Sequence, residues 1–350
     1  MDIRKIRLAL HRLKNLPSNK YLCKYLLNKV HQISLKFGKQ ERVAYPSTIM
    51  LELTNQCNLA CTICAREYDY GRNMDIGQMD FELAKKILDE TMPYLDSLGL
   101  TGLGETFLYK KLNEVVDYIR QRNNSIIISL STNASFRGFI DTAAPLIGKV
   151  NTLQVSVDGL GDTYESIRKN ASFRQLDDNL RQLSELCKGT GTSIMLNMVV
   201  TKDNYHQMSE MFAYARSYKI NYLNLARFNI ASATEVDDDY YEFYHTEEFL
   251  AELKVLEQAI TLDKSIHVSK PTLEYDGAFS KCIFPWSHFY ITWNGFVVPC
   301  CVKPFPKVMN FGSLHEETPI TILNNKKYRE FRRAWNLHEV PVFCRRCVGL

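Results

Sequence analysis

Short apolar segments with the pattern of β-strands alternate with segments of helical pattern over most of this chain. In the helical segments apolar residues recur every three or four positions. We expect strands at residues 48–54, 97–101, 126–130, 153–157, 193–200 and 222–226. This alternation predicts an α/β fold of parallel βαβ units, arranged as an open sheet or as a partial (β/α)6 barrel. Either arrangement places ligands at the carboxyl ends of the strands.

The sequence divides into four parts by pattern and charge. Residues 1–46 form a basic helical arm, 47–233 carry the alternating pattern, 234–270 are an acidic and then helical connector, and 271–350 form a cysteine-containing module. Eleven lysines and arginines against two acids give residues 1–42 a net charge of +9, whereas the whole chain has +4. The arm is therefore basic and the remainder is mildly acidic.

Two short helices are expected in the arm, separated by a Pro-Ser-Asn segment at residues 17–19. Their apolar residues are Ile3, Ile6, Leu10 and Leu13 in the first and Leu22, Leu26 and Val30 in the second. A basic amphipathic helix can lie on an anionic membrane surface or bind an acidic partner. Alternatively its apolar side packs on the body of the protein, and this is the arrangement we expect.

No apolar run reaches the roughly 18 residues of a spanning helix, and the charged start of the chain does not fit a signal peptide. We therefore expect a cytoplasmic protein, without a nucleic-acid partner. In a reducing compartment the ten cysteines are more typical of metal sites or chemistry than of disulfides.

Three cysteines follow the first predicted strand with the spacing Cys57-x3-Cys61-x2-Cys64. Thiolates at this spacing can converge on one site, and they select zinc, copper(I) or an iron–sulfur cluster. A structural zinc ion normally takes four protein ligands. Three ligands on a cubane would leave one iron open to a small molecule, while a zinc site completed by a distant residue is the alternative.

Residues 54–64 around these cysteines resemble the corresponding segment of the radical S-adenosylmethionine (SAM) enzymes. Further likeness follows the later strands in the same order. The matching segments are Gly102-Leu103-Gly104-Glu105-Thr106, Thr132-Asn133-Ala134 and Ser156-Val157-Asp158-Gly159, followed by Arg168. Leu103, Thr106, Ala134 and Ile63 depart from the residues that the family usually carries at these positions.

The resemblance implies a 4Fe-4S cluster on Cys57, Cys61 and Cys64, with SAM chelated to the fourth iron. It also implies contacts to the methionine ammonium from the carbonyls at Gly102 and Gly104 and from the Glu105 carboxylate. Ser156 and Arg168 would meet the ribose hydroxyls and the methionine carboxylate, and Arg offers forked donors for that purpose. Ile63 and Asn133 complete the expected cofactor contacts.

Four later cysteines, Cys282, Cys300, Cys344 and Cys347, resemble the C-terminal SPASM/twitch extension of the same superfamily. Asn294-Gly295 between the first two predicts a hairpin turn. The resemblance implies one auxiliary 4Fe-4S cluster held by these four residues. A four-cysteine structural zinc site is the alternative, and Cys301 could exchange roles with Cys300.

In this family an electron from the first cluster cleaves SAM, and the resulting 5′-deoxyadenosyl radical abstracts a hydrogen atom. We expect an oxidoreductase or epimerase acting on a small polar substrate, a sugar or an aminocyclitol. Asp276 and Glu274 are candidate bases and Cys301 is a candidate hydrogen donor. The basic arm could receive an acidic electron donor such as flavodoxin or ferredoxin.

A peptide or protein maturase with the same two clusters is the alternative function. A non-catalytic, zinc-stabilised interaction module is a third interpretation, against which the pattern of Glu105 and Arg168 speaks.

Overall fold

The computed structural model describes residue 17 and residues 19–36, 41–271, 273 and 282–347. Its strands are β1 (Thr48–Leu51), β2 (Ala60–Cys61), β3 (Ser97–Leu100), β4 (Ile127–Thr132), β5 (Thr152–Ser156), β6 (Arg168–Lys169), β7 (Ser193–Val200), β8 (Tyr222–Arg227), β9 (His267–Ser269), β10 (His288–Ile291), β11 (Phe296–Val298) and β12 (Gly312–Ser313). All six predicted strands are present, with ends that shift by at most three residues. The α/β class is confirmed.

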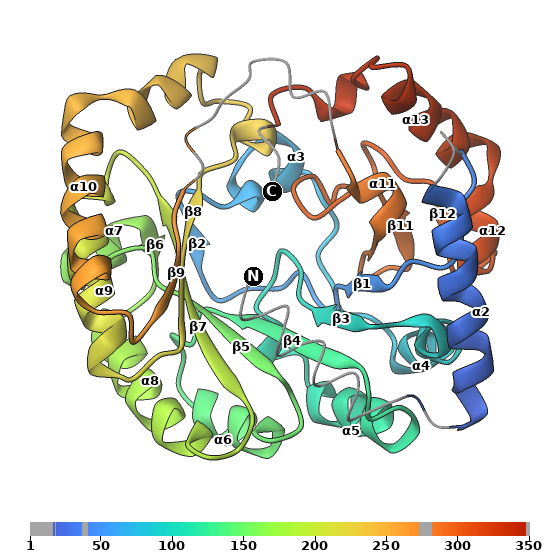
Figure 1. Ribbon diagram of the computed structural model, residues 1–350, viewed down its shortest axis with the longest axis horizontal. Helices are drawn as coiled ribbons and strands as arrows, with labels where there is room; N and C mark the ends of the chain where they lie inside the picture. The colour runs from blue at the N-terminus through green and yellow to red at the C-terminus, as the bar shows by residue number, and fades with distance from the viewer. Residues whose placement is uncertain (1–16, 18, 37–40, 272, 274–281, 348–350) are drawn as a thin grey trace. The chain divides into compact units, whose positions relative to one another are not determined.

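Helices alternate with these strands, as the sequence predicts (Figure 1). They are α2 (Asn19–Lys36), α3 (Asp69–Arg72), α4 (Phe81–Thr91), α5 (Leu112–Arg122), α6 (Phe139–Ala143), α7 (Gly161–Ile167), α8 (Phe173–Cys187), α9 (Met208–Ser217), α10 (Glu247–Leu262), α11 (Phe284–Ser287), α12 (Pro319–Asn324) and α13 (Lys326–Asn336). The predicted helix at residues 3–13 lies outside the described residues.

The chain folds into two compact units that combine segments distant in sequence. Unit 1 contains Met1–Gln56, Asp75–Ser129 and Ser280–Arg345, and unit 2 contains Cys57–Met74, Leu130–Phe279 and Arg346–Leu350. The four parts expected from the sequence are, in contrast, continuous segments of the chain. That division stays a prediction.

In unit 1, strand β1 lies between β3 and β10 and runs parallel to both, so that Thr48 is opposite Ser97 on one side and His288 on the other. The segment after residue 280 therefore continues the sheet that begins with β1. The hairpin predicted at Asn294-Gly295 joins β10 to the antiparallel β11, and Gly295 has the positive φ that this turn requires (+79°). The side chain of Asp80 caps α4, as predicted, by accepting from the N–H groups of the first helical turn.

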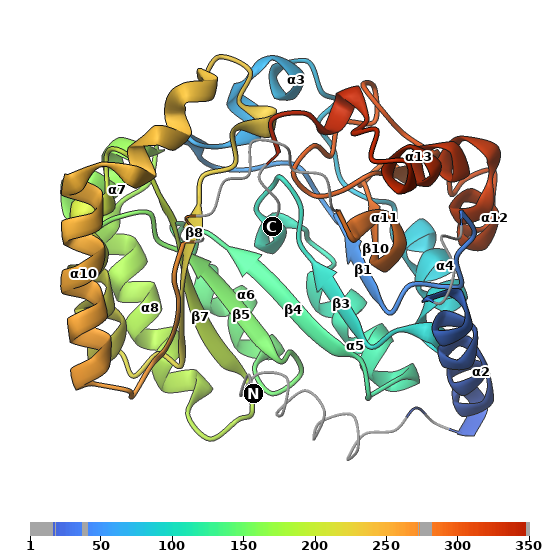
Figure 2. The same ribbon diagram turned by 45° about the horizontal axis from the view of Figure 1, so that its top comes forward.

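In unit 2, strands β5, β7, β8 and β9 run parallel and side by side, and Figure 2 shows β5, β7 and β8 in this order. Every second residue of β7 is buried, and helix α8 buries Leu176, Leu180 and Leu183 on the side that meets β7. A second sheet has only two short strands, β2 and β6, which pair antiparallel. That small sheet attaches the cysteine segment to the chain after α7.

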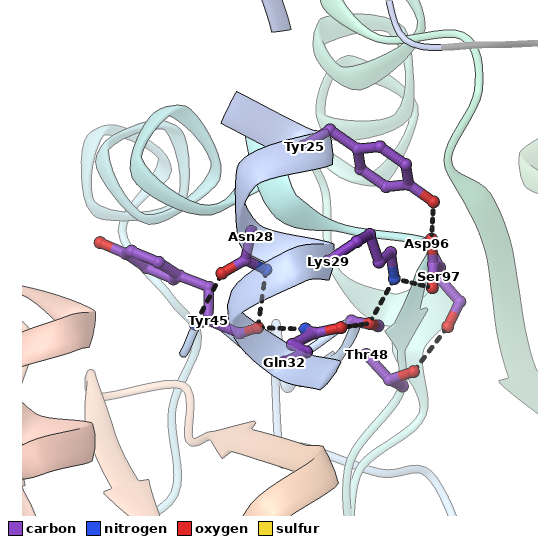
Figure 3. A network of polar contacts seen from close by, with 9 residues as sticks. Tyr25, Asn28, Lys29, Gln32, Tyr45, Thr48, Asp96 and Ser97 are labelled. Carbon is purple, nitrogen blue, oxygen red and sulfur yellow. Dashed lines mark hydrogen bonds and ion pairs between the residues drawn. The ribbon is translucent and has the colours of Figure 1, made fainter. Parts of the chain in front are cut away.

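The orientation of α2 contradicts the expectation that its apolar side packs on the body. Leu26 and Val30 are 52% and 65% exposed, because the opposite, polar side of the helix faces the protein (Figure 3). The Tyr25 hydroxyl and the Lys29 ammonium both bind the buried Asp96 carboxylate, at 2.5 and 2.6 Å. The Asn28 side chain donates to the Tyr45 carbonyl and accepts from the Tyr45 N–H. Hydrogen bonding rather than apolar burial therefore decides how this helix is oriented.

No helix among the residues that the structure describes is long and apolar enough to cross a membrane.

Replacing Asp96 with Ala should detach α2, since it leaves the Tyr25 hydroxyl and the Lys29 ammonium without their shared buried acceptor. We expect the free energy of unfolding to fall by about 2 kcal/mol and amide hydrogen exchange to accelerate along α2. Asp89→Ala is the matched control, because Asp89 also binds a tyrosine, Tyr118, but is 54% exposed. An equal effect of the two substitutions would contradict the assignment.

Candidate functional site

The three cysteines of the first group lie on one short, pinned segment of unit 2. Strand β2 places Cys61 opposite Arg168 of β6, and the Thr62 N–H donates to the Ile167 carbonyl at 2.9 Å. The Cys64 N–H donates to the Cys61 carbonyl at 3.0 Å, which closes a tight turn between them. Cys57, Cys61 and Cys64 are all partly exposed. The segment thus presents three thiols from a fixed backbone.

The electrostatics of these thiols suit a cationic ligand. The pKa of the Cys61 thiol is raised to about 12, chiefly by burial; Arg168 opposes this rise, and the neighbouring Cys64 and Cys57 contribute to it. Burial also raises the pKa of Cys64, against the lowering effect of the Arg66 N–H and guanidinium. The three thiolates repel one another, so positive charge at their centre is what would favour their deprotonation together.

No three His, Cys, Asp or Glu side chains within the described part of the chain are arranged to hold a single metal ion. The donor set nevertheless fits an iron–sulfur cubane, which takes each thiolate on a different iron. Soft sulfur ligands from one loop are the chemistry that such a cluster requires.

Beside this loop is a buried ion pair between Arg168 and Asp158, at 2.6 Å. Asp158 follows β5 and is fully buried, and its other carboxylate oxygen accepts from the Val199 N–H at 2.8 Å. Burial by itself would lower the pKa of Arg168, but Asp158 and Cys61 raise it above its usual value. The guanidinium therefore stays charged. Its Nε is buried without a hydrogen-bond partner among the described residues, so it retains a donor for an anionic group.

The turn after β4 also contacts the cysteine loop. Asn133 donates to the Asn58 side chain at 3.0 Å and approaches the Cys57 sulfur at 3.9 Å. Ala134 has a left-handed backbone (φ +50°), the conformation that glycine adopts most readily. Ala134, one of the departures from the family pattern, thus occupies a backbone conformation that would suit a glycine.

In unit 1, the Gly102–Glu105 loop follows β3 and packs closely on the chain after β1. A Cβ on Gly104 would lie 2.5–2.6 Å from backbone atoms of residues 54–56, so only glycine fits there. The Glu105 N–H donates to the Gln56 carbonyl at 2.8 Å. The Glu105 carboxylate accepts from the Phe107 N–H at the start of a short 3-10 helix. This capping role is present whether or not Glu105 also binds a cofactor.

The sequence analysis missed Glu52, which is 2% exposed. Its carboxylate accepts from the Leu103 N–H at 3.0 Å, the Tyr290 hydroxyl at 2.9 Å and the Trp293 N–H at 3.3 Å. Gly102 has no side chain where a Cβ would collide with this carboxylate. Glu52 therefore joins the loop after β3 to the β10 hairpin. The only signal in the sequence was a charged residue inside an apolar segment.

Cys282, Cys300 and Cys344 of the second group lie in unit 1, whereas Cys347 lies in unit 2 and accepts from the Asn229 side chain at 3.5 Å. The pKa of Tyr328 is raised to about 12, chiefly by burial; Arg332 opposes this rise, and Cys300 and Cys282 contribute to it, so both thiols lie near that ring. The buried Lys303 donates to the Phe343 carbonyl at 2.6 Å. This bond ties the loop after Cys300 to the segment that carries Cys344.

Of the three residues expected to act as a base or hydrogen donor, the structure describes only Cys301. Asp276 and Glu274 lie outside the described residues. Cys301 is partly exposed and lies near Tyr290. The pKa of Tyr290 is raised well above its usual value, first by burial, then by Glu52, and to a smaller extent by Cys301 and Cys300. Ser156 ends β5, and Ile63 is partly exposed within the cysteine loop. Their expected contacts to a cofactor stay predictions, as does the choice between Cys300 and Cys301.

Residues 51–215 match the model of the radical SAM superfamily, and residues 282–348 match that of the SPASM iron–sulfur cluster-binding domain. The chain belongs to the radical SAM superfamily. Its two domains imply a 4Fe-4S cluster, an auxiliary cluster and SAM as cofactors.

Known proteins resemble this chain over different parts of their length. The "tungsten-containing aldehyde ferredoxin oxidoreductase cofactor-modifying protein" of Pyrococcus furiosus is 23% identical over 81% of this chain and 82% of its own. Mycofactocin maturase MftC of Mycolicibacterium smegmatis is 29% identical, over 49% of this chain and 42% of its own. This chain therefore spans less than half of MftC.

Among solved structures, Streptococcus suis SuiB bound to SAM superposes with a TM-score of 0.67, covering 87% of this chain and 71% of SuiB. The identity is 16%, so this likeness concerns the fold.

Gly104→Ala should lower the rate of reductive SAM cleavage at least about tenfold, because the new Cβ would collide with backbone that cannot move aside. Gly99→Ala is the matched control, since a Cβ there has its nearest neighbour at an ordinary 3.6 Å. Cleavage is followed as 5′-deoxyadenosine, and circular dichroism verifies folding. Equal activity in the two variants would show that the close approach at Gly104 is not needed.

Proposed function

We propose that this chain is a radical SAM peptide maturase. The observation that carries the radical chemistry is the set of three thiols on one segment, pinned by β6 beside the buried Arg168–Asp158 pair. Cys57, Cys61 and Cys64 hold the 4Fe-4S cluster in this proposal. When bound, the cluster supplies the electron that splits SAM into methionine and the 5′-deoxyadenosyl radical that abstracts hydrogen from substrate.

The residues of the chain bind and orient SAM. Arg168 provides a charged guanidinium with an unused Nε donor for the methionine carboxylate, while Asp158 holds that guanidinium in place. The Gly102–Glu105 loop offers acceptors for the ammonium group. Asn133 keeps the Cys57 turn in shape through Asn58. Fixing the nucleotide in this way aligns its reactive carbon with the substrate.

Cys282, Cys300, Cys344 and Cys347 hold the auxiliary cluster in the proposal. Lys303 ties the loop after Cys300 to the segment that carries Cys344, and Tyr328 lies near Cys300 and Cys282. An electron donor of the flavodoxin or ferredoxin type supplies the reducing equivalent.

A peptide substrate is proposed because of the relatives. SuiB has been captured with its precursor peptide SuiA, and MftC is named as a maturase. The expected sugar or aminocyclitol substrate has no support among these relatives. The Pyrococcus relative, named for modifying a cofactor, keeps a second candidate open: a small-molecule substrate of the cofactor type.

Cys61→Ala should abolish 5′-deoxyadenosine formation after anaerobic reconstitution with iron, sulfide, SAM and dithionite. Removing one of the three thiolates leaves one iron of the cluster without its protein ligand. Cys23→Ala is the control, because Cys23 is exposed on α2. Undiminished cleavage by a fully reconstituted Cys61→Ala variant would refute the cluster assignment.

The substrate class can be read from the hydrogen atom that 5′-deoxyadenosine acquires. Extract from cells grown on deuterated nutrients is separated into a peptide fraction and a small-molecule fraction, and each is offered to the reconstituted enzyme. We expect deuterated 5′-deoxyadenosine, identified by mass spectrometry, with the peptide fraction. Deuterium transfer from the small-molecule fraction alone would favour the cofactor-type substrate instead.

A further inference from the structure

An apolar stripe runs along the outward face of helix α2. Its members are Leu26, Leu27, Val30 and Ile33, which are 52%, 66%, 65% and 56% exposed, with the exposed Cys23 in line. Their spacing places all of them on one side of the helix. Four large apolar side chains in one row, each more than half exposed, form a contiguous patch of the kind that marks an interaction site.

The helix cannot turn this stripe inward without losing the contacts of its polar face. Figure 3 shows that face directed at the protein, where Tyr25 and Lys29 share Asp96, and Asn28 and Gln32 reach Tyr45. The Lys29–Asp96 contact is an ion pair with a carboxylate that is only 6% exposed. The polar network therefore fixes the stripe on the outside.

Basic groups border the stripe along one edge. By helical geometry Lys20, Lys24 and His31 follow next to the apolar row, and all three are exposed. Residues 1–42, which include this helix, carry a net charge of +9. The exposed face thus combines apolar side chains with positive charge, the two features that hold a helix in the interface of an anionic lipid bilayer.

We propose that α2 docks this chain on an anionic membrane surface, with the stripe inserted among the lipid headgroups. The charge distribution favours this occupant over a second copy of the chain, since pairing two stripes would bring two strongly basic arms together. Docking of this kind is peripheral and independent of the proposed peptide chemistry.

The test uses the full-length protein and sedimentation with two kinds of vesicle, phosphatidylcholine alone and phosphatidylcholine mixed with phosphatidylglycerol. We expect binding to the anionic vesicles, weakened by added salt, and at least about a tenfold weaker partition for the double variant Leu26→Glu/Val30→Glu. The reductive cleavage of SAM should be unchanged in that variant, which shows that it is folded.

Val255→Glu/Leu262→Glu is the matched control. These residues of α10 are also exposed, at 50% and 89%, but that helix carries four glutamates and one lysine. The control should bind anionic vesicles as the unmodified protein does.

Three results would overturn the proposal. They are failure of the unmodified protein to bind anionic vesicles, equal binding by the α2 variant, and loss of a dimer or of acidic-peptide binding in that variant without a change in vesicle binding.

Discussion

The buried Arg168–Asp158 ion pair is the contact on which the cysteine segment depends. Arg168 belongs to β6, which pairs with β2, and Asp158 follows β5 in the parallel sheet of unit 2. Removing one partner of such a pair typically costs about 3–5 kcal/mol, because the other charge is left buried and uncompensated. The ion pair and the β2–β6 pairing together attach the cysteine segment, whose Leu59 is also buried, to the end of this strand. The position of the thiols thus depends on a buried charge pair in addition to backbone pairing and the burial of Leu59.

Elements with a strong local signal could be predicted from the sequence. The alternation in β7, the Asp80 cap of α4 and the Asn294-Gly295 turn are each decided by a few neighbouring residues, and the structure contains all of them. The cysteine spacing likewise identified the superfamily that the comparisons show. Local rules sufficed because nothing distant competes with them at these positions.

Features that depend on distant partners could not be predicted. The two-residue strands β2 and β6 are too short to leave a pattern, and the role of Glu52 depends on Leu103 and Tyr290, which are far away in sequence. The orientation of α2 was predicted wrongly because periodicity identifies the apolar face without saying what the polar face can bind. Asp96, which holds that polar face, lies about 70 residues further along the chain.

The position of β10 beside β1 has a consequence for how such a protein can be shortened or recombined. A fragment ending before residue 288 would leave the backbone groups of β1 unpaired along one edge and the Glu52 carboxylate without the Tyr290 hydroxyl. Open strand edges invite pairing between molecules, and therefore aggregation. The region matched by the superfamily model alone is thus not a self-sufficient folding piece, and exchange of modules between relatives would need to transfer the β10 hairpin together with its acceptor strand.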